Sequence, residues 1–273
     1  STGPASVNFN TGKLYRLEFP DLSIEDIADS AAFTIRALGF KKLACIIGVS
    51  MGGMSALAFI ARHPDLAQNH INICSAMYAL PFTIAIRSLQ REAIRLDPHW
   101  NQGDYNESYY PKQGMLIARK LGLITYRSGY EWEKRFGRSC LDLQKNTNKK
   151  IFDFEFQIES YLDFHAHRFI SFFDPNSYLY LSRCMDWFEF SKSCDDSASP
   201  LPKINLKNVL VIGVKTDILF PIEQQQQIAK YLMKAAVNVE FLGLDSPQGH
   251  DAFLVDTKRF GGPIANFLSN LNQ

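Results

Sequence analysis

The apolar positions of this chain follow two different spacings, which predict strands and helices in turn. Short apolar runs bounded by polar or turn-forming residues are typical of buried strands. They fall at 43–47, 71–76, 209–214 and 237–242. Apolar residues three to four positions apart are typical of helices. These cover 21–38, 54–62, 83–96, 114–121, 154–173 and 223–234. Strands therefore lie toward both ends of the chain, with a long helical stretch between them.

This order predicts an α/β fold that a helical insertion interrupts. Helices alternate with strands at both ends, as in a mostly parallel sheet. We expect an N-terminal part of the core at 1–80, a helical cap at 81–200 and a C-terminal part of the core at 201–273. The polar run 142–150 is interpreted as a loop, and 191–202, rich in Ser, Asp and Pro, as a boundary.

Charge and cysteine content narrow the class of protein. The formal net charge is +1, from 29 basic and 28 acidic residues that are interspersed, so we expect neither nucleic acid nor membrane as a partner. No apolar run is long enough to span a bilayer, and no signal peptide is visible. The five cysteines are scattered without metal-ligand spacing, which favours reduced thiols in the cytoplasm and no metal site.

The segment 48–52, with the sequence GVSMG, is the strongest chemical motif. It lies between the predicted strand 43–47 and the predicted helix 54–62. A G-x-S-x-G motif between a strand and a helix is typical of a nucleophile elbow, whose strained turn exposes the serine hydroxyl. Small residues beside the serine let the strand and the helix approach closely. Ser50 is therefore the candidate nucleophile.

A serine nucleophile needs a base and an acid that orients the base. Among six histidines, His250 lies in a turn between the last predicted strand and an apolar helix. Asp217 directly follows the predicted strand 209–214. The order Ser50, Asp217, His250 is the chain order of the catalytic residues in enzymes with this elbow. The alternative is that Asp217 caps a turn and His250 is a surface loop residue.

Seven segments carry a more specific resemblance. In chain order they are 48–54 (GVSMGGM), 118–126 (ARKLGLITY), 136–138 (FGR), 159–162 (ESYL), 173–181 (FDPNSYLYL), 217–221 (DILFP) and 249–254 (GHDAFL). With these segments the chain resembles the homoserine O-acetyltransferase family. That family is an acyl-CoA-dependent branch of the α/β-hydrolases and also includes serine and homoserine O-succinyltransferases. The resemblance implies an α/β-hydrolase fold with a helical cap between nucleophile and acid.

The resemblance assigns a role to each residue at the elbow and at the sheet edge. Ser50 takes the acyl group from coenzyme A, His250 moves the protons, and Asp217 orients the imidazole. The backbone N–H of Met51 is one oxyanion-hole donor. The second donor of this fold comes from a loop upstream of the elbow. We expect this chain to lack that loop, because only the elbow strand is visible before Ser50.

The acyl acceptor implied by the resemblance is an amino acid, L-serine or L-homoserine. Arg119 and Tyr126 match substrate-contacting positions of the cap, where a guanidinium can hold a carboxylate through two hydrogen bonds. Asp251 matches the partner of the substrate ammonium group. The alternatives remain that Arg119 pairs with a surface acid, that Tyr126 is packed, and that Asp251 caps the following helix.

Arg87 bears on the acyl group. Succinyl-transferring members resemble this chain in having arginine in this stretch, and a cation pairs with the terminal carboxylate of a succinyl group but not with an acetyl group. We therefore favour succinyl-CoA over acetyl-CoA as co-substrate, with no further cofactor. The alternative is that Arg87 is a solvated helix residue.

Several choices stay open at this point. L-Serine and L-homoserine differ by one methylene, which a pocket discriminates by only about 1–3 kcal/mol. A homoserine O-acetyltransferase, an esterase that uses water as acceptor, and an inactive fragment are the alternative functions. Family members commonly form dimers through the cap, so we expect a homodimer. The aromatic stretch 154–173 suits that interface, unless it is buried within the monomer.

Overall fold

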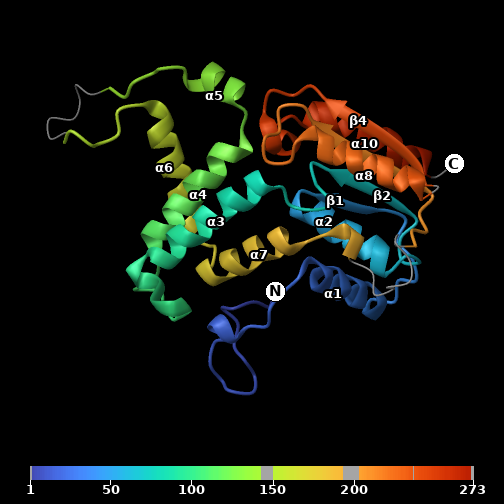
Figure 1. The fold of residues 1–273 in the computed structure, drawn as a ribbon, viewed down its shortest axis with the longest axis horizontal. Coiled ribbons are helices and arrows are strands. Elements are labelled where there is room, and N and C mark those ends of the chain that lie inside the picture. The colour runs from blue at the N-terminus through green and yellow to red at the C-terminus, as the bar shows by residue number, and fades with distance from the viewer. Residues whose placement is uncertain (1, 143–149, 193–202, 236, 272–273) are drawn as a thin grey trace. The chain divides into compact units, whose positions relative to one another are not determined.

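The computed structural model describes residues 2–142, 150–192, 203–235 and 237–271. The chain divides into two compact units (Figure 1). The sheet unit comprises residues 22–83 together with the chain from 183 onward, and the helical unit comprises the chain up to residue 21 together with 84–182. Most of the predicted loop 142–150 and of the predicted boundary 191–202 lies outside the described residues. The limits 1–80, 81–200 and 201–273 stay predictions about domains.

The sheet unit is built on four parallel strands in the order β1-β2-β3-β4. The strands are β1 (Ile46–Val49), β2 (Asn69–Ile73), β3 (Asn208–Val214) and β4 (Asn238–Leu244). Gly48 of β1 pairs with Asn72 of β2, which pairs in turn with Val211 of β3. The four predicted strands are thus present. Strand β1 begins later than predicted, whereas β2 begins earlier, because Asn69 and His70 are polar but buried.

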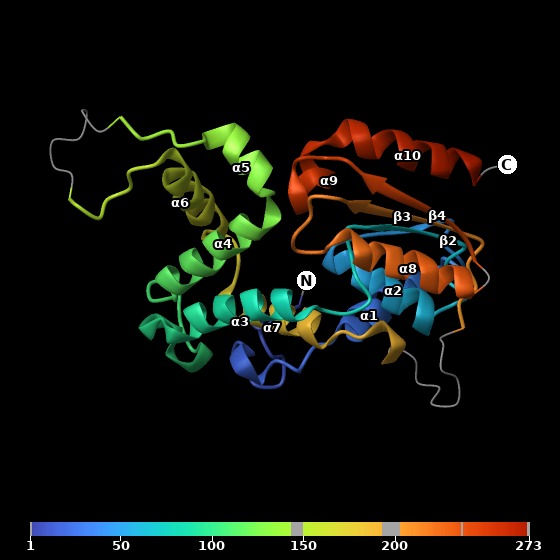
Figure 2. The same ribbon diagram turned by 45° about the horizontal axis from the view of Figure 1, so that its top comes forward.

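Helices cover both faces of this sheet. They are α1 (Ile24–Ala37), α2 (Met51–Arg62), α8 (Ile222–Lys234), α9 (Ala252–Val255) and α10 (Thr257–Asn270). Figure 2 shows α10 on one face and α2 with α8 on the other. Phe260 and Phe267 of α10 pack against the apolar β2 and β3 side chains, including Leu210 and Ile212, to form the core of that face. Burying such side chains stabilises the fold by roughly 1.5–3 kcal/mol each.

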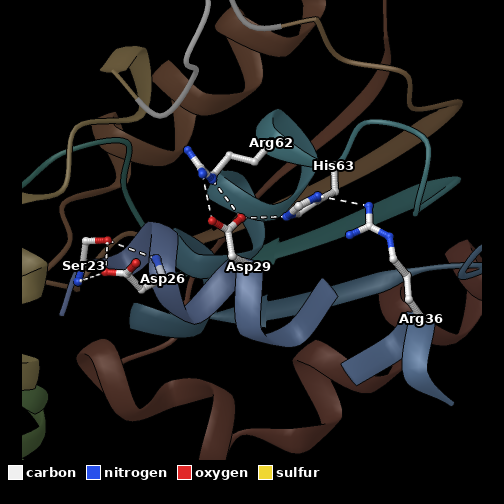
Figure 3. Close-up of polar contacts among 6 residues, drawn as sticks. All are labelled: Ser23, Asp26, Asp29, Arg36, Arg62 and His63. Atoms are coloured by element: carbon white, nitrogen blue, oxygen red, sulfur yellow. Dashed lines mark hydrogen bonds and ion pairs between the residues drawn. The ribbon is translucent and has the colours of Figure 1, made fainter. Parts of the chain in front are cut away.

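Charged side chains connect helix α1 to the end of α2. Ser23 and Asp26 form a capping box that begins α1, which satisfies the free N–H groups of its first turn. One turn later, Asp29 accepts two hydrogen bonds of 2.8 Å from Arg62 and lies 2.7 Å from Nε2 of His63 (Figure 3). The hydrogen bonds from Arg62 hold the pKa of Asp29 below its usual range. His63 therefore has a structural partner at the end of α2.

Among the described residues, the helical unit contains five helices. They are α3 (Pro81–Leu96), α4 (Lys112–Tyr126), α5 (Gly129–Phe136), α6 (Gln157–Ile170) and α7 (Pro175–Trp187), the last of which runs on into the sheet unit. Helices α3, α4, α6 and α7 supply side chains to a second core, with Ile94, Met115, Ala118 and Ala166 at its centre. The predicted helix 154–173 is shorter than expected, because α6 ends at Ile170 and Pro175 begins a new helix. Among the described helices, none combines the length and the apolar character needed to cross a bilayer.

Candidate active site

Ser50 occupies the sharp turn between β1 and α2. Its backbone has φ 54° and ψ −122°, a conformation that an L-residue adopts only under strain. The Ser50 N–H donates to the carbonyl of Ile73 at the end of β2, and α2 begins at the next residue, Met51. As the first residue of the helix, Met51 has an N–H with no acceptor inside α2. The strand-turn-helix context predicted for the serine is therefore present.

Two glycines allow this turn to pack. A Cβ atom on Gly48 would lie 2.4 Å from the carbonyl oxygen of Gly52, and one on Gly53 would lie 2.4 Å from the Cβ of Ser75. Both distances are far below van der Waals contact. By contrast, a Cβ on Gly52 would meet nothing within 4 Å. The close approach expected for small residues thus applies to positions 48 and 53, and the second glycine of the motif faces open space.

The structure brings Ser50, His250 and Asp217 together, although the chain separates Ser50 from His250 by 200 residues. His250 Nε2 lies 2.9 Å from Ser50 Oγ, and His250 Nδ1 lies 2.7 Å from Asp217 Oδ2. Asp217 and His250 are each 4% exposed. The alternative of a surface histidine is therefore wrong. Asp217 also caps its own turn, through Oδ1, while Oδ2 faces His250.

Backbone N–H groups orient the Asp217 carboxylate. Its Oδ1 atom accepts hydrogen bonds from the N–H groups of Leu219 (2.9 Å) and Phe220 (2.8 Å). Because these groups can only donate, Oδ1 must remain an acceptor, and Oδ2 is left for the imidazole. His250 Nδ1 therefore carries a proton toward Asp217, and Nε2 is free to accept the proton of Ser50 Oγ. This is the tautomer that a general base requires.

Thr216 holds the His250 loop against the end of β3. Its hydroxyl donates to the carbonyl of Ser246 over 2.6 Å and accepts from the N–H of Gly249 over 3.1 Å. The Phe220 ring lies 5.1 Å from the imidazole of His250, between centroids. These contacts fix the histidine loop from the same turn that carries Asp217. No local sequence pattern predicts this role for a single threonine.

A buried polar chain lies beneath the elbow. His70 Nδ1 is 3.1 Å from the carbonyl of Ile46, and His70 Nε2 is 3.1 Å from the side-chain amide of Asn72. That amide is also 3.3 Å from the carbonyl of Gly53 in α2. Burial lowers the pKa of His70 to about 4, so the ring is neutral. This chain links β1, β2 and the elbow helix.

The helical unit contains Arg119 and Tyr126, which are both expected on the cap. Arg119 lies between two rings, 4.4 Å from the centroid of Phe169 and 5.4 Å from that of Tyr126. Its Nε atom is buried and has no hydrogen-bond partner, and Arg119 makes no ion pair among the described residues. The alternative of a surface ion pair is therefore wrong. The Tyr126 side chain runs back along its own helix to Gly122. A Cβ atom added at Gly122 would lie 3.2 Å from the Tyr126 hydroxyl.

Arg87 lies on α3, with Arg91 one turn later. Arg87 is only 4% exposed, so the alternative of a solvated helix residue is wrong. Arg91 donates a hydrogen bond of 2.8 Å to Ser182 Oγ of α7. A buried guanidinium is costly unless something compensates its charge.

Asp251 follows His250 and lies in the sheet unit. It occupies the N-cap position of α9, but its carboxylate makes no capping hydrogen bond. The alternative that Asp251 caps this helix is therefore wrong. No cluster of three potential metal ligands occurs within the described ranges. The four cysteines described there, Cys45, Cys74, Cys140 and Cys184, are free thiols.

Comparison with known proteins identifies the fold family. Residues 3–257 match the α/β-hydrolase fold family. The chain is 60% identical over 272 residues to a serine O-succinyltransferase of Xylella fastidiosa strain M12, a match that covers 99% of this chain and 73% of that protein. It is 58% identical over 281 residues to the serine O-succinyltransferase of Xanthomonas campestris pv. campestris strain B100, with 99% and 74% covered.

Solved structures show the same fold at lower identity. A homoserine O-acetyltransferase from Bacillus anthracis superposes with a TM-score of 0.86 at 24% identity and covers all of this chain and 71% of that one. Esterase E22 superposes with a TM-score of 0.83, also at 24% identity, covering 98% of this chain and 72% of that one. The chain therefore belongs to the α/β-hydrolase fold family. Within that fold it is an acyltransferase of the family that contains the serine O-succinyltransferases.

Proposed function

We propose that this chain moves an acyl group from coenzyme A to the side-chain hydroxyl of L-serine or L-homoserine, with succinyl as the favoured group. The observation that carries the proposal is the continuous hydrogen-bonded line from Asp217 through His250 to Ser50. It occurs in a chain 60% identical to a serine O-succinyltransferase. The step belongs to amino-acid biosynthesis, in the branch that leads to cysteine or methionine.

The first half-reaction transfers the acyl group to the enzyme. Ser50 Oγ attacks the thioester carbonyl carbon while His250 Nε2 takes the hydroxyl proton, and Asp217 stabilises the imidazolium that forms. The Met51 N–H donates to the developing oxyanion. The carbon–sulfur bond then breaks. His250 returns the proton to the thiolate, coenzyme A leaves as the free thiol, and Ser50 carries the acyl group as an ester.

The second half-reaction runs the same chemistry with the amino acid. His250 Nε2 takes the proton of the acceptor hydroxyl, whose oxygen attacks the acyl carbon of the Ser50 ester. The bond to Ser50 Oγ breaks, and His250 gives the proton back to that oxygen. Because coenzyme A leaves before the amino acid reacts, the mechanism is ping-pong.

Charged groups of the amino acid and of the acyl chain are recognised separately. Arg119 binds the acceptor carboxylate, in keeping with its unpartnered Nε atom, and Tyr126 contacts the same substrate. Asp251 binds the ammonium group. Arg87 binds the terminal carboxylate of the succinyl group, because a guanidinium can hold a carboxylate through two parallel hydrogen bonds.

Crossing two donors with two acceptors tests the reaction. Succinyl-CoA and acetyl-CoA are each incubated with L-serine and with L-homoserine, and thiol release is followed together with the mass of the product. We expect O-acylated amino acid and the greatest turnover with succinyl-CoA. Thiol release that neither amino acid changes would reject the transferase and leave a hydrolase that uses water.

Arg87→Gln tests the reading of the acyl group, with Arg95→Gln as its control. Arg95 lies on the same helix and is exposed. Arg87→Gln should reduce kcat/KM for succinyl-CoA far more than for acetyl-CoA, and Arg95→Gln should change neither. An equal loss with both donors in Arg87→Gln would reject the specificity role.

We also propose a homodimer formed through the helical unit, in the cytoplasm. Phe164 of α6 is 59% exposed and Phe172, which follows α6, is 75% exposed, an unusual position for large aromatic side chains. The free thiols of the described cysteines suit a reducing compartment. Phe164→Glu should shift the mass measured by light scattering from dimer to monomer. A wild-type protein that is monomeric at micromolar concentration would reject the dimer.

A further inference from the structure

The hydroxyl of Tyr178 is an unused hydrogen-bond donor in the helical unit. Tyr178 lies on α7 and is partly buried against the second core. Its ring meets Phe169 and Phe173 edge-on, with centroids 6.3 Å and 6.2 Å away. Across the part of the chain that the structure describes, the Tyr178 hydroxyl has no hydrogen-bond partner. Because this hydroxyl is not among the fully buried unpaired polar atoms, a ligand can reach it.

The surroundings of this hydroxyl are cationic. Phe169 contacts both side chains, because the Arg119 guanidinium lies 4.4 Å from its ring centroid and Tyr178 meets the ring edge-on. Burial raises the pKa of Tyr178, Tyr126 raises it further, and Arg119, Arg87 and Arg91 lower it. No carboxylate of the described residues is among the groups that shift this pKa. The phenol therefore keeps its proton at neutral pH and faces positive charge.

In the cluster formed by Tyr178 and Arg119, the Tyr178 hydroxyl and the Arg119 Nε atom have no acceptor among the described residues. An arginine can only donate, and the buried Nε atom of Arg119 has no partner. A buried donor left unsatisfied is unfavourable, so the cluster favours a ligand that brings acceptor oxygens. A carboxylate is such a ligand, because its oxygens accept from a guanidinium and from a phenol at once.

We propose that Tyr178 is a further substrate-binding residue, whose O–H donates to a substrate carboxylate held by Arg119 or by Arg87. The identity of this carboxylate rests on the proposed function. It is either the α-carboxylate of the acceptor amino acid or the terminal carboxylate of the succinyl group. Tyr178 is thus distinct from Tyr126, whose ring lies on the guanidinium of Arg119 from within the same helix.

The matched pair Tyr178→Phe and Tyr180→Phe tests this proposal. Both variants remove one phenolic hydroxyl from α7, but the Tyr180 hydroxyl donates to the backbone carbonyl of Phe19, 2.8 Å away. Binding of L-serine, L-homoserine and succinate is measured by calorimetry on the full chain. Tyr178→Phe should lower the affinity for at least one of these ligands about tenfold, which is the loss expected for one charge-assisted hydrogen bond. Tyr180→Phe should bind all three as the wild type does.

Kinetics distinguish the two carboxylates. A KM for the amino acid that rises in Tyr178→Phe with both succinyl-CoA and acetyl-CoA assigns the phenol to the acceptor. A loss of kcat/KM that appears only with succinyl-CoA assigns it to the acyl group. Tyr178→Phe that matches the wild type in binding and in kinetics overturns the proposal, as does a wild type that binds none of the three ligands and transfers no acyl group.

The same experiment separates this inference from the proposed function. If wild-type protein transfers no acyl group to either amino acid, but ligand binding is still weaker in Tyr178→Phe, the function fails and the anion site remains. If acyl transfer occurs and Tyr178→Phe leaves it unchanged, the function stands and the inference fails. Thermal unfolding of both variants confirms that each is folded before the comparison.

Discussion

Gly53 approaches Ser75 so closely that a Cβ on residue 53 would lie 2.4 Å from the Ser75 Cβ. This contact, one helical position beyond the motif glycine Gly52, sets how near α2 comes to the end of β2. Ser75 is fully buried, so neither residue can move aside without disturbing the packing around Ser50.

Gly53→Ala should therefore destabilise the protein, and Gly52→Ala should not. Overpacking of this kind costs about 1–3 kcal/mol, whereas alanine at the open position 52 meets no atom within 4 Å. The measurement is the free energy of unfolding from urea titrations of the two variants. Equal stability of the two variants would mean that the α2 packing is looser than these distances indicate.

Asp217→Asn should abolish most activity without unfolding the protein. The N–H groups of Leu219 and Phe220 must keep the amide oxygen facing them, so the NH2 group points at His250 Nδ1. The imidazole then has to carry its proton on Nε2 and can no longer accept from Ser50. We expect a loss of about 10⁴ in kcat, as for a wrong tautomer. Turnover within tenfold of the wild type would contradict the assignment of Asp217.

Gly122→Ala should weaken binding of the acceptor amino acid while leaving the fold intact. The new Cβ would lie 3.1 Å from Gln90 Nε2, 3.2 Å from the Tyr126 hydroxyl and 3.3 Å from its Cζ, so the Tyr126 ring that contacts Arg119 has to shift by a few tenths of an ångström. Alanine also favours the helix by up to about 1 kcal/mol. We expect KM for the amino acid to rise about 3- to 10-fold with no loss of thermal stability. Gly129→Ala, which meets nothing within 4 Å, is the control and should leave KM unchanged.

His70 should make stability depend on pH between about 4 and 6.5. Burial lowers its pKa from 6.5 to about 4, so in this window the unfolded chain binds a proton that the folded chain excludes. Stability therefore falls as pH decreases, by about 3 kcal/mol across the window. Urea unfolding at several pH values measures this slope, and His70→Gln should reduce it. An identical slope in wild type and His70→Gln would show that residue 70 is not responsible.

The elements that carry the site follow from local patterns. Apolar runs predicted all four strands, and Ser50, Asp217 and His250 were selected because each adjoins a strand of a parallel sheet. Parallel strands end at the same edge, so residues that follow them meet even when they are far apart in sequence. The hydrogen bonds of this trio agree with that reasoning, while its catalytic role stays a prediction for the assays above.

Other features depend on contacts that no local pattern encodes. Asn69, His70 and Asn72 make β2 look partly polar, yet all three are buried because their side chains bond to neighbouring backbone or to one another. Gly52 and Gly53 are indistinguishable in the sequence, but only one touches Ser75. Tyr178 is one tyrosine among eleven, and its unpaired hydroxyl is visible only once α7 is packed against Phe169.

The backbone conformation of Ser50 lowers the stability of the fold while it presents the side chain for the proposed chemistry. A side chain at φ 54° and ψ −122° is strained, and such strain is on the order of 1–3 kcal/mol. Glycine at this position would relax the turn, so Ser50→Gly, which lacks the proposed nucleophile, should be more stable than the wild type. Selection for thermal robustness alone would thus tend to remove the proposed nucleophile. The same variant would be a durable form in which to trap intact acyl-CoA.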